Sequence, residues 1–191
     1  MPMTANGRRR RTQSKTGSVT ERRKASTLVA ARSAVSRIIA DNQPVEQTIG
    51  LVLAALVESL GWDYAAFWQI DPSAQALRCT QSAQSPADPC PRFDADTHAR
   101  SFEIDVGLPG ELWRSGKPVW VPDVREEPRF LRAASALEDR LRAVCMVPVF
   151  IDAQLAGHLE LFSRERSDLD SNLLEALAEM AGKLGQFVVR R

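Results

Sequence analysis

The sequence has few cysteines and no long apolar run. Its three cysteines, Cys79, Cys90 and Cys145, are odd in number and none is spaced as Cys-x-x-Cys. This argues against a disulfide framework or a zinc knuckle and suits a reducing compartment. The longest apolar run, Ile49–Val57, is far shorter than the roughly 20 residues that a bilayer span needs. Polar residues follow the four arginines at 8–11, so these do not form an export signal. We therefore expect a cytoplasmic protein.

Catalytic signatures are also lacking. No nucleophile–base pair, paired-carboxylate motif or HExxH spacing is present, and such motifs are what hydrolases and metalloenzymes require. The Gly107-x-x-Gly110 pattern lacks the GxxxxGK[ST] form of a phosphate-binding loop. The sequence thus predicts neither an enzyme nor a metal site, and it does not identify a cofactor.

What the chain does have is an uneven distribution of charge. Residues 1–37 contain ten Lys or Arg and one acid, whereas the remainder is acidic, so the net charge of +1 hides a basic arm on an acidic body. Such an arm can bind nucleic acid or an anionic membrane electrostatically. No aromatic residue lies among its charges, however, and base stacking needs one. We therefore do not favour nucleic acid as a partner.

The pattern along the chain predicts three parts. Residues 1–17 lack apolar periodicity and should be a disordered basic tail. Residues 18–41 should form a helix, because Ser18-x-x-Glu21 resembles a capping box and apolar residues then recur at steps of three and four. Residues 42–191, which hold most of the apolar content, should form the globular domain.

The expected fold class is α+β. A helical stripe at 45–60 is followed by two strands at 62–70 and 74–81, which are joined by a short turn. Two further strands at 144–152 and 154–164 precede a C-terminal helix that starts near Asp168. Strands that follow one another in hairpins imply a central antiparallel sheet, here of five or six strands, with helices packed on it.

The stretch GLPGELWRSGKPVWVPDV (Gly107–Val124) concentrates glycine, proline and tryptophan. Pro109 suits the first turn of a short helix and Gly116 its end. The following KPVWVPDV should be an extended edge strand, because proline flanks it on both sides. Val119 and Val121 would then share one face while Trp120 points to the other.

This stretch, together with RAVCMVPVFIDAQLAGHLELFSRE and the helix at Asp170–Phe187, resembles a GAF domain. GAF domains are sensory, small-molecule-binding and dimerising modules of bacterial signalling proteins. The resemblance covers about Val45–Arg191 and implies N- and C-terminal helices on one face of the sheet. On the other face it implies a ligand pocket roofed by loops and short helices.

The resemblance places the roof of this pocket at Ala87–Ser101 and Asp123–Leu137, over strands that end at Cys79 and run through Val144–Phe150. Core packing without any ligand is the alternative for most of the aromatic residues, because buried rings dominate small cores. The candidate pocket residues are Arg78, Phe93, His98, Phe102, Leu112, Trp113, Trp120, Asp123, Phe130 and Cys145.

Haem ligation by His98 is conceivable by resemblance, but a histidine in a polar helix is more often exposed. For His158, on an apolar strand, we expect a structural or edge role. Cys145 should be an inert core thiol. Cys79 and Cys90 flank the expected pocket, but the cysteine set of the free methionine-sulfoxide reductases, GAF-fold enzymes, is not recognisable.

We therefore predict a sensory or regulatory GAF domain that binds a small molecule and signals through its flanking helices. These helices, Thr20–Ala40 and Asp168–Arg191, should form a homodimer, although their stripes could instead cover their own domain. Two alternatives stay open. One is a ligand-free dimerisation or interaction scaffold, and the other is a small redox enzyme that uses Cys79 or Cys90.

Overall fold

The structure is a computed structural model that describes the backbone of residues 10–189 and the side chains of residues 21–189. The first nine residues of the predicted basic tail lie outside this range. From Arg10 onward the chain is helical, so the helix begins eight residues before the predicted capping box at Ser18. The segment between Arg10 and Ser18 lacks proline and contains Arg, Lys and Gln, which favour a helix, and the single Gly17 does not end it.

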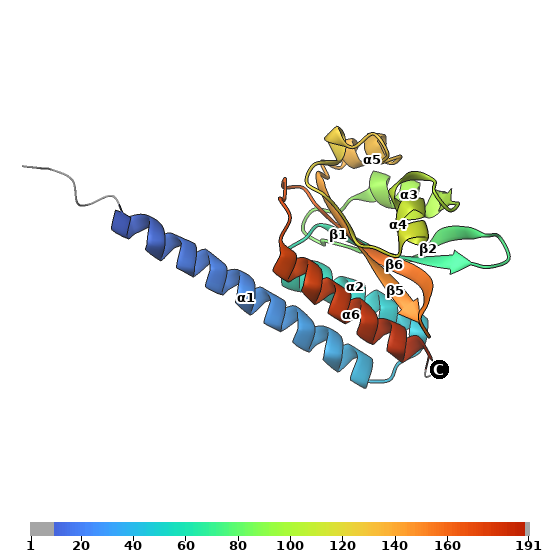
Figure 1. Cartoon of the computed structure of the whole chain (residues 1–191), viewed down its shortest axis with the longest axis horizontal. Coiled ribbons are helices and arrows are strands. Elements are labelled where there is room, and N and C mark those ends of the chain that lie inside the picture. Colours follow the sequence, from blue (N-terminus) through green and yellow to red (C-terminus); the bar gives the residue numbers. More distant parts are fainter. Residues whose placement is uncertain (1–9, 190–191) are drawn as a thin grey trace, which may run out of the picture.

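A six-stranded, fully antiparallel sheet forms the centre of the molecule (Figure 1), in the order β3-β2-β1-β6-β5-β4. The predicted fold class is confirmed. The two-residue strand β3 was not predicted, because so short a segment carries no periodicity. The strands are β1 (Tyr64–Asp71), β2 (Ala76–Gln84), β3 (Ser101–Phe102), β4 (Val119–Val121), β5 (Ala143–Ile151) and β6 (Gln154–Ser163).

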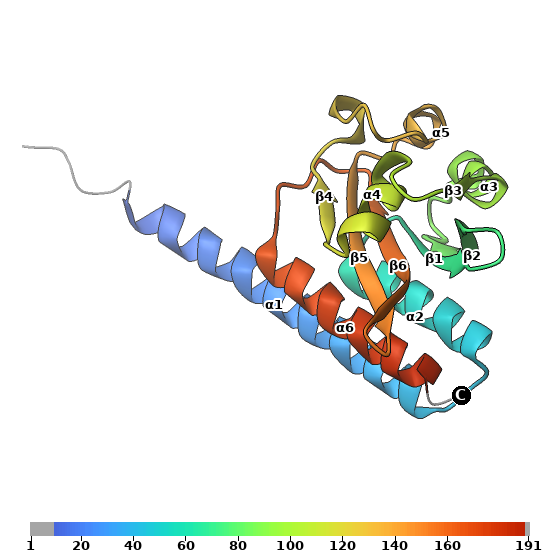
Figure 2. The ribbon, with the colours of Figure 1, turned by 45° about the vertical axis from the view of Figure 1, so that its right-hand side comes forward.

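Three long helices cover one face of this sheet: α1 (Arg10–Ala40), α2 (Val45–Leu60) and α6 (Ser171–Val189). Figure 2 shows α1, α2 and α6 side by side, with the N-terminal part of α1 running past the others. Gly61 ends α2 in the left-handed conformation, with φ of 67°, as predicted for a C-terminal glycine. Among residues 10–189, no helix combines the length and the apolar character that a membrane crossing requires.

Short helices and loops cover the opposite face (Figures 1 and 2). The glycine- and tryptophan-rich stretch forms a helix and the edge strand β4, as predicted, and Gly107 and Gly116 both adopt positive φ of 62° where the chain reverses. These roof elements are α3 (Pro91–Ala99), α4 (Gly107–Ser115), η1 (Val124–Glu126) and α5 (Ala133–Glu138).

Strand alternation divides the interior into two cores. On β1 and β6, the pairs Ala65–Leu161 and Phe67–Leu159 face the long helices. The neighbouring pairs Tyr64–Phe162, Ala66–Glu160 and Trp68–His158 face the roof. Because both faces are covered, even the polar residues His158 and Glu160 of the central strand β6 are buried. The roof-side core therefore contains side chains that a one-sided sheet would expose to water.

Candidate functional site

The roof-side face of the sheet carries a polar floor. His158 and Glu160 are two residues apart on β6, and Trp68 lies directly across from His158 on β1. All three are completely buried. The indole of Trp68 donates a 2.7 Å hydrogen bond to Oε1 of Glu160 and stacks on the His158 ring with an interplanar angle of 7°. The floor is therefore a fixed carboxylate flanked by two aromatic rings.

Arg132 enters this floor from the roof. It immediately precedes α5, and its side chain is only 1% exposed. Its Nη1 and Nη2 donate 2.7 Å bonds to the two oxygens of Glu160, and Nη1 also donates to the hydroxyl of Thr97 on α3 at 2.9 Å. Such two-pronged pairing is the strongest geometry that an arginine and a carboxylate form.

Five aromatic rings surround the guanidinium of Arg132. Their centroids lie between 4.9 and 5.8 Å from its Cζ, within the range of cation–π attraction. We call the rings and Glu160 together the arginine cage. The rings come from β1, α3, β3, the loop after η1, and β6, and they are Trp68, Phe93, Phe102, Phe130 and Phe162.

Two opposing effects set the pKa values in the cage: burial, which disfavours charged groups, and pairing with an opposite charge, which favours them. Burial by itself would raise the pKa of Glu160, but the charge and hydrogen bonds of Arg132, together with the nearby His158, outweigh it and lower the pKa to about 2. Burial also lowers the pKa of His158, against the attraction of Glu160, so the imidazole is neutral. An ionised pair beside a neutral histidine leaves the buried cluster without net charge.

His158 is the exception to complete pairing. Its Nε2 lies 3.9 Å from Oε2 of Glu160, which is too long for a hydrogen bond. Among the described residues, neither ring nitrogen has a hydrogen-bond partner. Most buried polar atoms have one. Of the two roles expected for His158, structural or edge, the edge role is wrong, because β6 is a central strand and the side chain is wholly buried.

Three predicted pocket residues meet at the cage: Phe93, Phe102 and Phe130. Leu112 is buried in the same core, and Trp113 packs against its rim. Arg78 lies away from the cage, 56% exposed, and is paired with Asp71. These positions agree with a roof-side interior lined by aromatic rings.

Two other predicted pocket residues lie on the opposite face of the sheet. Trp120 and Cys145 are cross-strand partners that point toward the long helices, where Trp120 contacts Trp62 and Cys145 is buried. They cannot line the roof-side interior. The reason is the two-residue alternation of β4 and β5, which places Val121 and Val144 on the roof side instead.

Asp123 is buried, and its carboxylate binds a backbone N–H and two arginine side chains. It caps η1 by accepting from the N–H of Arg125, and it pairs with the side chains of Arg125 and Arg142. The bonds from Arg125, together with those from Arg142, outweigh the opposing effect of burial and hold the pKa of Asp123 well below its usual value. Its place at the start of η1 gives it a structural role in the roof.

His98 belongs to a separate polar network at the outer edge of α3. Its Nε2 lies 3.0 Å from the hydroxyl of Ser82 and 3.9 Å from Sγ of Cys79. Both Ser82 and Tyr64 donate to Asp94. Burial above all raises the pKa of the Cys79 thiol to about 12, so this thiol is protonated near neutral pH. Within the part of the chain that the structure describes, no histidine, cysteine and acidic side chains are grouped as metal ligands would be.

Cys90 and Cys145 are also protonated thiols. Burial raises the pKa of Cys90 to about 11 despite the nearby charge of Arg164, and burial raises the pKa of Cys145 further. All three cysteines are free. Since the thiolate is the nucleophilic form, these environments do not activate any of the three.

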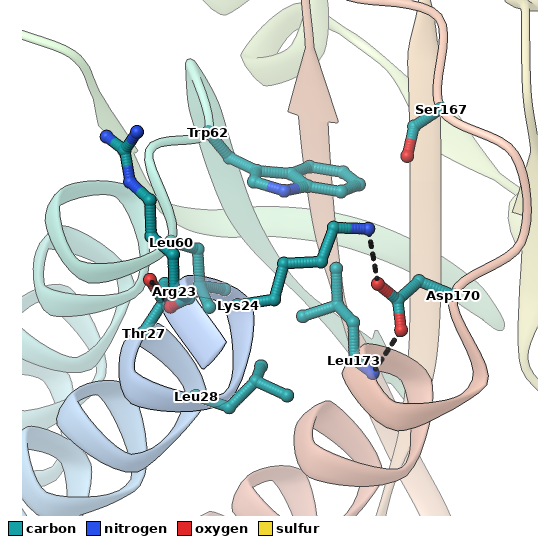
Figure 3. Close-up of a pocket in the computed structure, with 9 residues that line it drawn as sticks. All are labelled: Arg23, Lys24, Thr27, Leu28, Leu60, Trp62, Ser167, Asp170 and Leu173. Carbon is teal, nitrogen blue, oxygen red and sulfur yellow. Dashed lines mark hydrogen bonds and ion pairs between the residues drawn. The ribbon is translucent and has the colours of Figure 1, made fainter. Parts of the chain in front are cut away.

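A groove lies on the helix side, at the junction of α1, α2 and the start of α6 (Figure 3). This groove has a volume of about 230 Å³. Lys24 crosses it beneath Trp62 to reach Asp170 at 3.1 Å, and Asp170 also accepts from the backbone N–H of Leu173. The Lys24–Asp170 ion pair therefore links α1 to the start of α6 across this groove. We do not assign a ligand to it.

The structure has the architecture that the sequence resemblance implied. An antiparallel sheet carries long helices on one face and a roofed interior on the other. Family comparison agrees, since the family described as GAF domain matches residues 42–189. The chain therefore belongs to the GAF domain family.

Solved structures with this fold include both signalling domains and enzymes. The chain is similar to the GAF domain of A. aeolicus nlh2 in an inactive state, with a TM-score of 0.72, 18% identity and coverage of 87% of this chain and 99% of that one. It is also similar to the GAF domain of a phosphoenolpyruvate-protein phosphotransferase from Coxiella burnetii (0.73, 16%, 87% and 95%). A third is the free methionine-R-sulfoxide reductase of Neisseria meningitidis in complex with its substrate (0.68, 22%, 85% and 92%). A search of curated proteins found none that matches the chain.

Sequence reasoning missed Arg132 and Glu160, the two charged residues at the centre of the site. One signal was available: His158 and Glu160 alternate with apolar residues on a strand that the predicted roof covers. Polar residues at such positions are buried and need a partner. For Arg132 no signal was available, because arginine is usually exposed and only the folded chain brings it to Glu160.

Proposed function

We propose that this domain is a sensory or regulatory module that binds a small molecule at the arginine cage and responds through α1 and α6. The observation that carries the proposal is the burial of ionised and polar groups under the roof. Taking charged groups out of water is costly even when they are paired, and replacing a buried ion pair with apolar residues is often neutral or stabilising. Stability of the core alone therefore does not call for this pair. Family membership, with neighbours from signalling proteins, supports the same reading.

The path to the helices runs through the sheet. The floor residues Trp68 and Glu160 alternate along β1 and β6 with residues that pack against the long helices. On the far side, α6 approaches β5 so closely that Gly185 lies against the carbonyl of Phe150. A ligand can shift this arrangement only by as much as its affinity differs between the two states.

A thermal-shift screen of small metabolites tests this proposal. A cognate ligand should raise the Tm, and above its Kd the rise should grow with the logarithm of its concentration. The Glu160→Gln variant should reduce that response. A response that Glu160→Gln leaves intact would place binding elsewhere. A complete screen without any response would leave the alternative of a ligand-free scaffold.

The second part of the proposal is a homodimer formed with a second copy of the chain through α1 and α6. Val29 on α1 and Leu169 just before α6 are 60% and 58% exposed, and part of α1 runs past the other helices (Figure 1). An isolated helical segment is marginal in water without a packing partner. A second α1 would supply one.

The stripe that suggested dimerisation is used within the chain, however. Ala31 and Val35 are fully buried against the domain's own core, with Leu28 and Ile38 packed beside them. A dimer must therefore use other residues. The test is the molar mass in solution of the full chain and of the Val29→Glu variant. A dimer that Val29→Glu converts to a monomer supports the proposal, and a monomeric full chain contradicts it.

The reductase neighbours keep an enzymatic alternative open for testing. Reduction of free methionine sulfoxide with a thiol reductant is the assay, with the Cys79→Ser/Cys90→Ser double variant as its control. We expect no turnover, because burial keeps both thiols protonated near neutral pH. Turnover that the double variant abolishes would establish the redox enzyme instead.

A further inference from the structure

The two charged residues that meet at the arginine cage come from different layers of the fold. Glu160, Trp68 and Phe162 belong to the two central strands, β1 and β6, where backbone hydrogen bonds on both sides hold them. Arg132 comes instead from the roof, after the turns at 128–132 that precede α5. The negative charge thus sits on a strand that is paired on both sides, and the positive charge sits on a turn outside the sheet.

The arginine cage without Arg132 is chemically a cation site. Five ring faces and one carboxylate converge on the position of the guanidinium, all within 6 Å. Ring faces attract cations through their quadrupole, and recognition of organic cations by aromatic cages uses this effect. The indole of Trp68 orients the carboxylate independently of Arg132. Arg132 therefore occupies a site that would suit an external cation of the same shape.

His158 indicates that Arg132 is not the occupant that completes the site. Its two ring nitrogens are buried beside Glu160 without hydrogen-bond partners among the described residues. A neutral imidazole offers one donor and one acceptor, and the acceptor suits an N–H of a cationic ligand. An occupant that reached both Glu160 and His158 would satisfy the floor more fully than Arg132 does.

Charge balance distinguishes between ligand classes. An anion that joined the present cluster would add a second negative charge near Glu160, in an interior where unpaired charge is costly. A cation that replaced Arg132 would leave the interior neutral and release Arg132 to water. The exchange keeps one cation against one carboxylate.

Building on the function proposed above, we propose that the ligand of this domain is a small organic cation, a guanidinium or alkylammonium compound, and that it displaces Arg132 from the arginine cage. In the ligand-free state Arg132 is an internal competitor. Its release frees the turn at 131–132, while Phe130 stays packed on Phe93 and Phe162. Ser135 bonded to Asp96 and Arg92 bonded to Glu138 keep α5 attached to α3. The response therefore begins at the N-terminal end of α5.

The test titrates the full chain with four probes of similar size: methylguanidine, tetramethylammonium, neutral methylurea and anionic acetate. Calorimetry measures binding, and a thermal scan measures the Tm. A ligand at a hundred times its Kd should raise the Tm of a domain of this size by roughly 5–10 °C. We expect such a response to at least one of the two cations and none to methylurea or acetate.

Variants then test displacement. Arg132→Ala empties the cage and should bind methylguanidine at least about 10-fold more tightly than the wild type, because the internal competitor is gone. Arg132→Ala/Glu160→Gln should lose this binding. Arg129→Ala, in the same turn but exposed and paired with Glu127 and Glu111, should behave as the wild type. If Arg132→Ala fails to fold alone, methylguanidine but not methylurea should restore its folding.

Several results would overturn the inference. Cation binding to Arg132→Ala but never to the wild type would make Arg132 a permanent structural group. Equal cation affinity in both proteins would exclude displacement. A further contrary result is that acetate or another anion binds the wild type and loses that binding in Arg132→Ala. The ligand would then be an anion and not a cation, while the proposed sensory function would stand. Only a metabolite screen that yields no ligand of any charge would remove both.

Discussion

Glu160 accepts three hydrogen bonds in an interior that water does not reach, from the indole of Trp68 and from both terminal nitrogens of Arg132. Removing one partner of a buried pair leaves an uncompensated charge, which typically costs about 3–5 kcal/mol. We predict this loss for Glu160→Gln, measured by urea denaturation. Glu111→Gln breaks an exposed pair with Arg129 and should cost at most about 1 kcal/mol. Equal losses would show that the cage pair is no stronger than a surface contact.

The same residue gives stability a defined pH dependence. The pKa of Glu160 is about 2 in the folded protein and 4.5 ordinarily, because Arg132 overcomes the effect of burial. As the pH falls below about 4.5, Glu160 binds a proton in the unfolded chain, whereas in the folded protein it stays ionised until about pH 2. The stability that ionised Glu160 contributes is therefore complete above about pH 5 and is lost between 4.5 and 2.

Urea midpoints measured from pH 7 to pH 3 test this dependence. The wild type should lose stability more steeply below pH 4.5 than Glu160→Gln, while Glu111→Gln should follow the wild type. Parallel curves for the wild type and Glu160→Gln would mean that Glu160 is not held ionised by its surroundings.

At the scale of elements, α6 offers a matched pair of glycines. A Cβ at Gly185 would overlap the carbonyl oxygen of Phe150 on β5, whereas a Cβ at Gly182 would meet nothing within 4 Å. We predict that Gly182→Ala stabilises by up to about 1 kcal/mol through helix propensity. Gly185→Ala should destabilise by roughly 1–3 kcal/mol through overpacking. Thermal unfolding of both variants is the measurement, and a stabilising Gly185→Ala would show that α6 does not pack this closely on β5.

The turn between β5 and β6 requires a left-handed backbone conformation at two residues that are not glycine. Asp152 and Ala153 adopt positive φ of 47° and 63°, the conformation of a tight hairpin turn that favours Asp-Gly. Ala153→Gly removes the Cβ penalty and should stabilise by up to about 1 kcal/mol. Ala74→Gly, in the β1–β2 turn, replaces an alanine that has no positive φ and should give no gain. A stabilising Ala74→Gly would mean that chain composition, rather than turn geometry, controls the effect.

Elements with strong local signals were predicted well. The helix at 45–60, the hairpins β1–β2 and β5–β6, and the corner that leads to β4 each carry their own periodicity or turn residues. The start of α1 and the strand β3 were not predicted. A capping motif such as Ser18-x-x-Glu21 can lie inside a helix when nothing upstream ends it, and a two-residue strand exists only because β2 is beside it.

At the scale of the whole molecule, α1 is part of the core and not a detachable appendage. Ala31 and Val35 are fully buried against α2 and α6. Deletion of residues 1–41 should therefore lower the Tm and expose apolar surface that binds a hydrophobic dye. Deletion of residues 1–20 keeps Ala31 and Val35 in place and should lower the Tm less. If both truncations retain the wild-type Tm, the domain boundary lies after α1.

The candidate site was predictable in its outline but not in its chemistry. Phe93, Phe102 and Phe130 were expected under the roof and lie there, since large rings close to predicted loops seek the interior. Trp120 and Cys145 lie on the opposite face, because a single step along a strand reverses the side that a residue faces. Arg132 and Glu160 were missed because each alone is typical of a surface.

The sequence by itself determined the fold class, the order of the main elements and the family, because periodicity, turn residues and motif spacing are local properties of the chain. The tertiary structure alone decided that β6 is central and covered on both faces, and this turns His158 and Glu160 from surface residues into a buried floor. It also decided that Arg132, 28 residues before Glu160, fills that floor. Burial depends on which segments meet in space, and no local pattern in the chain records that.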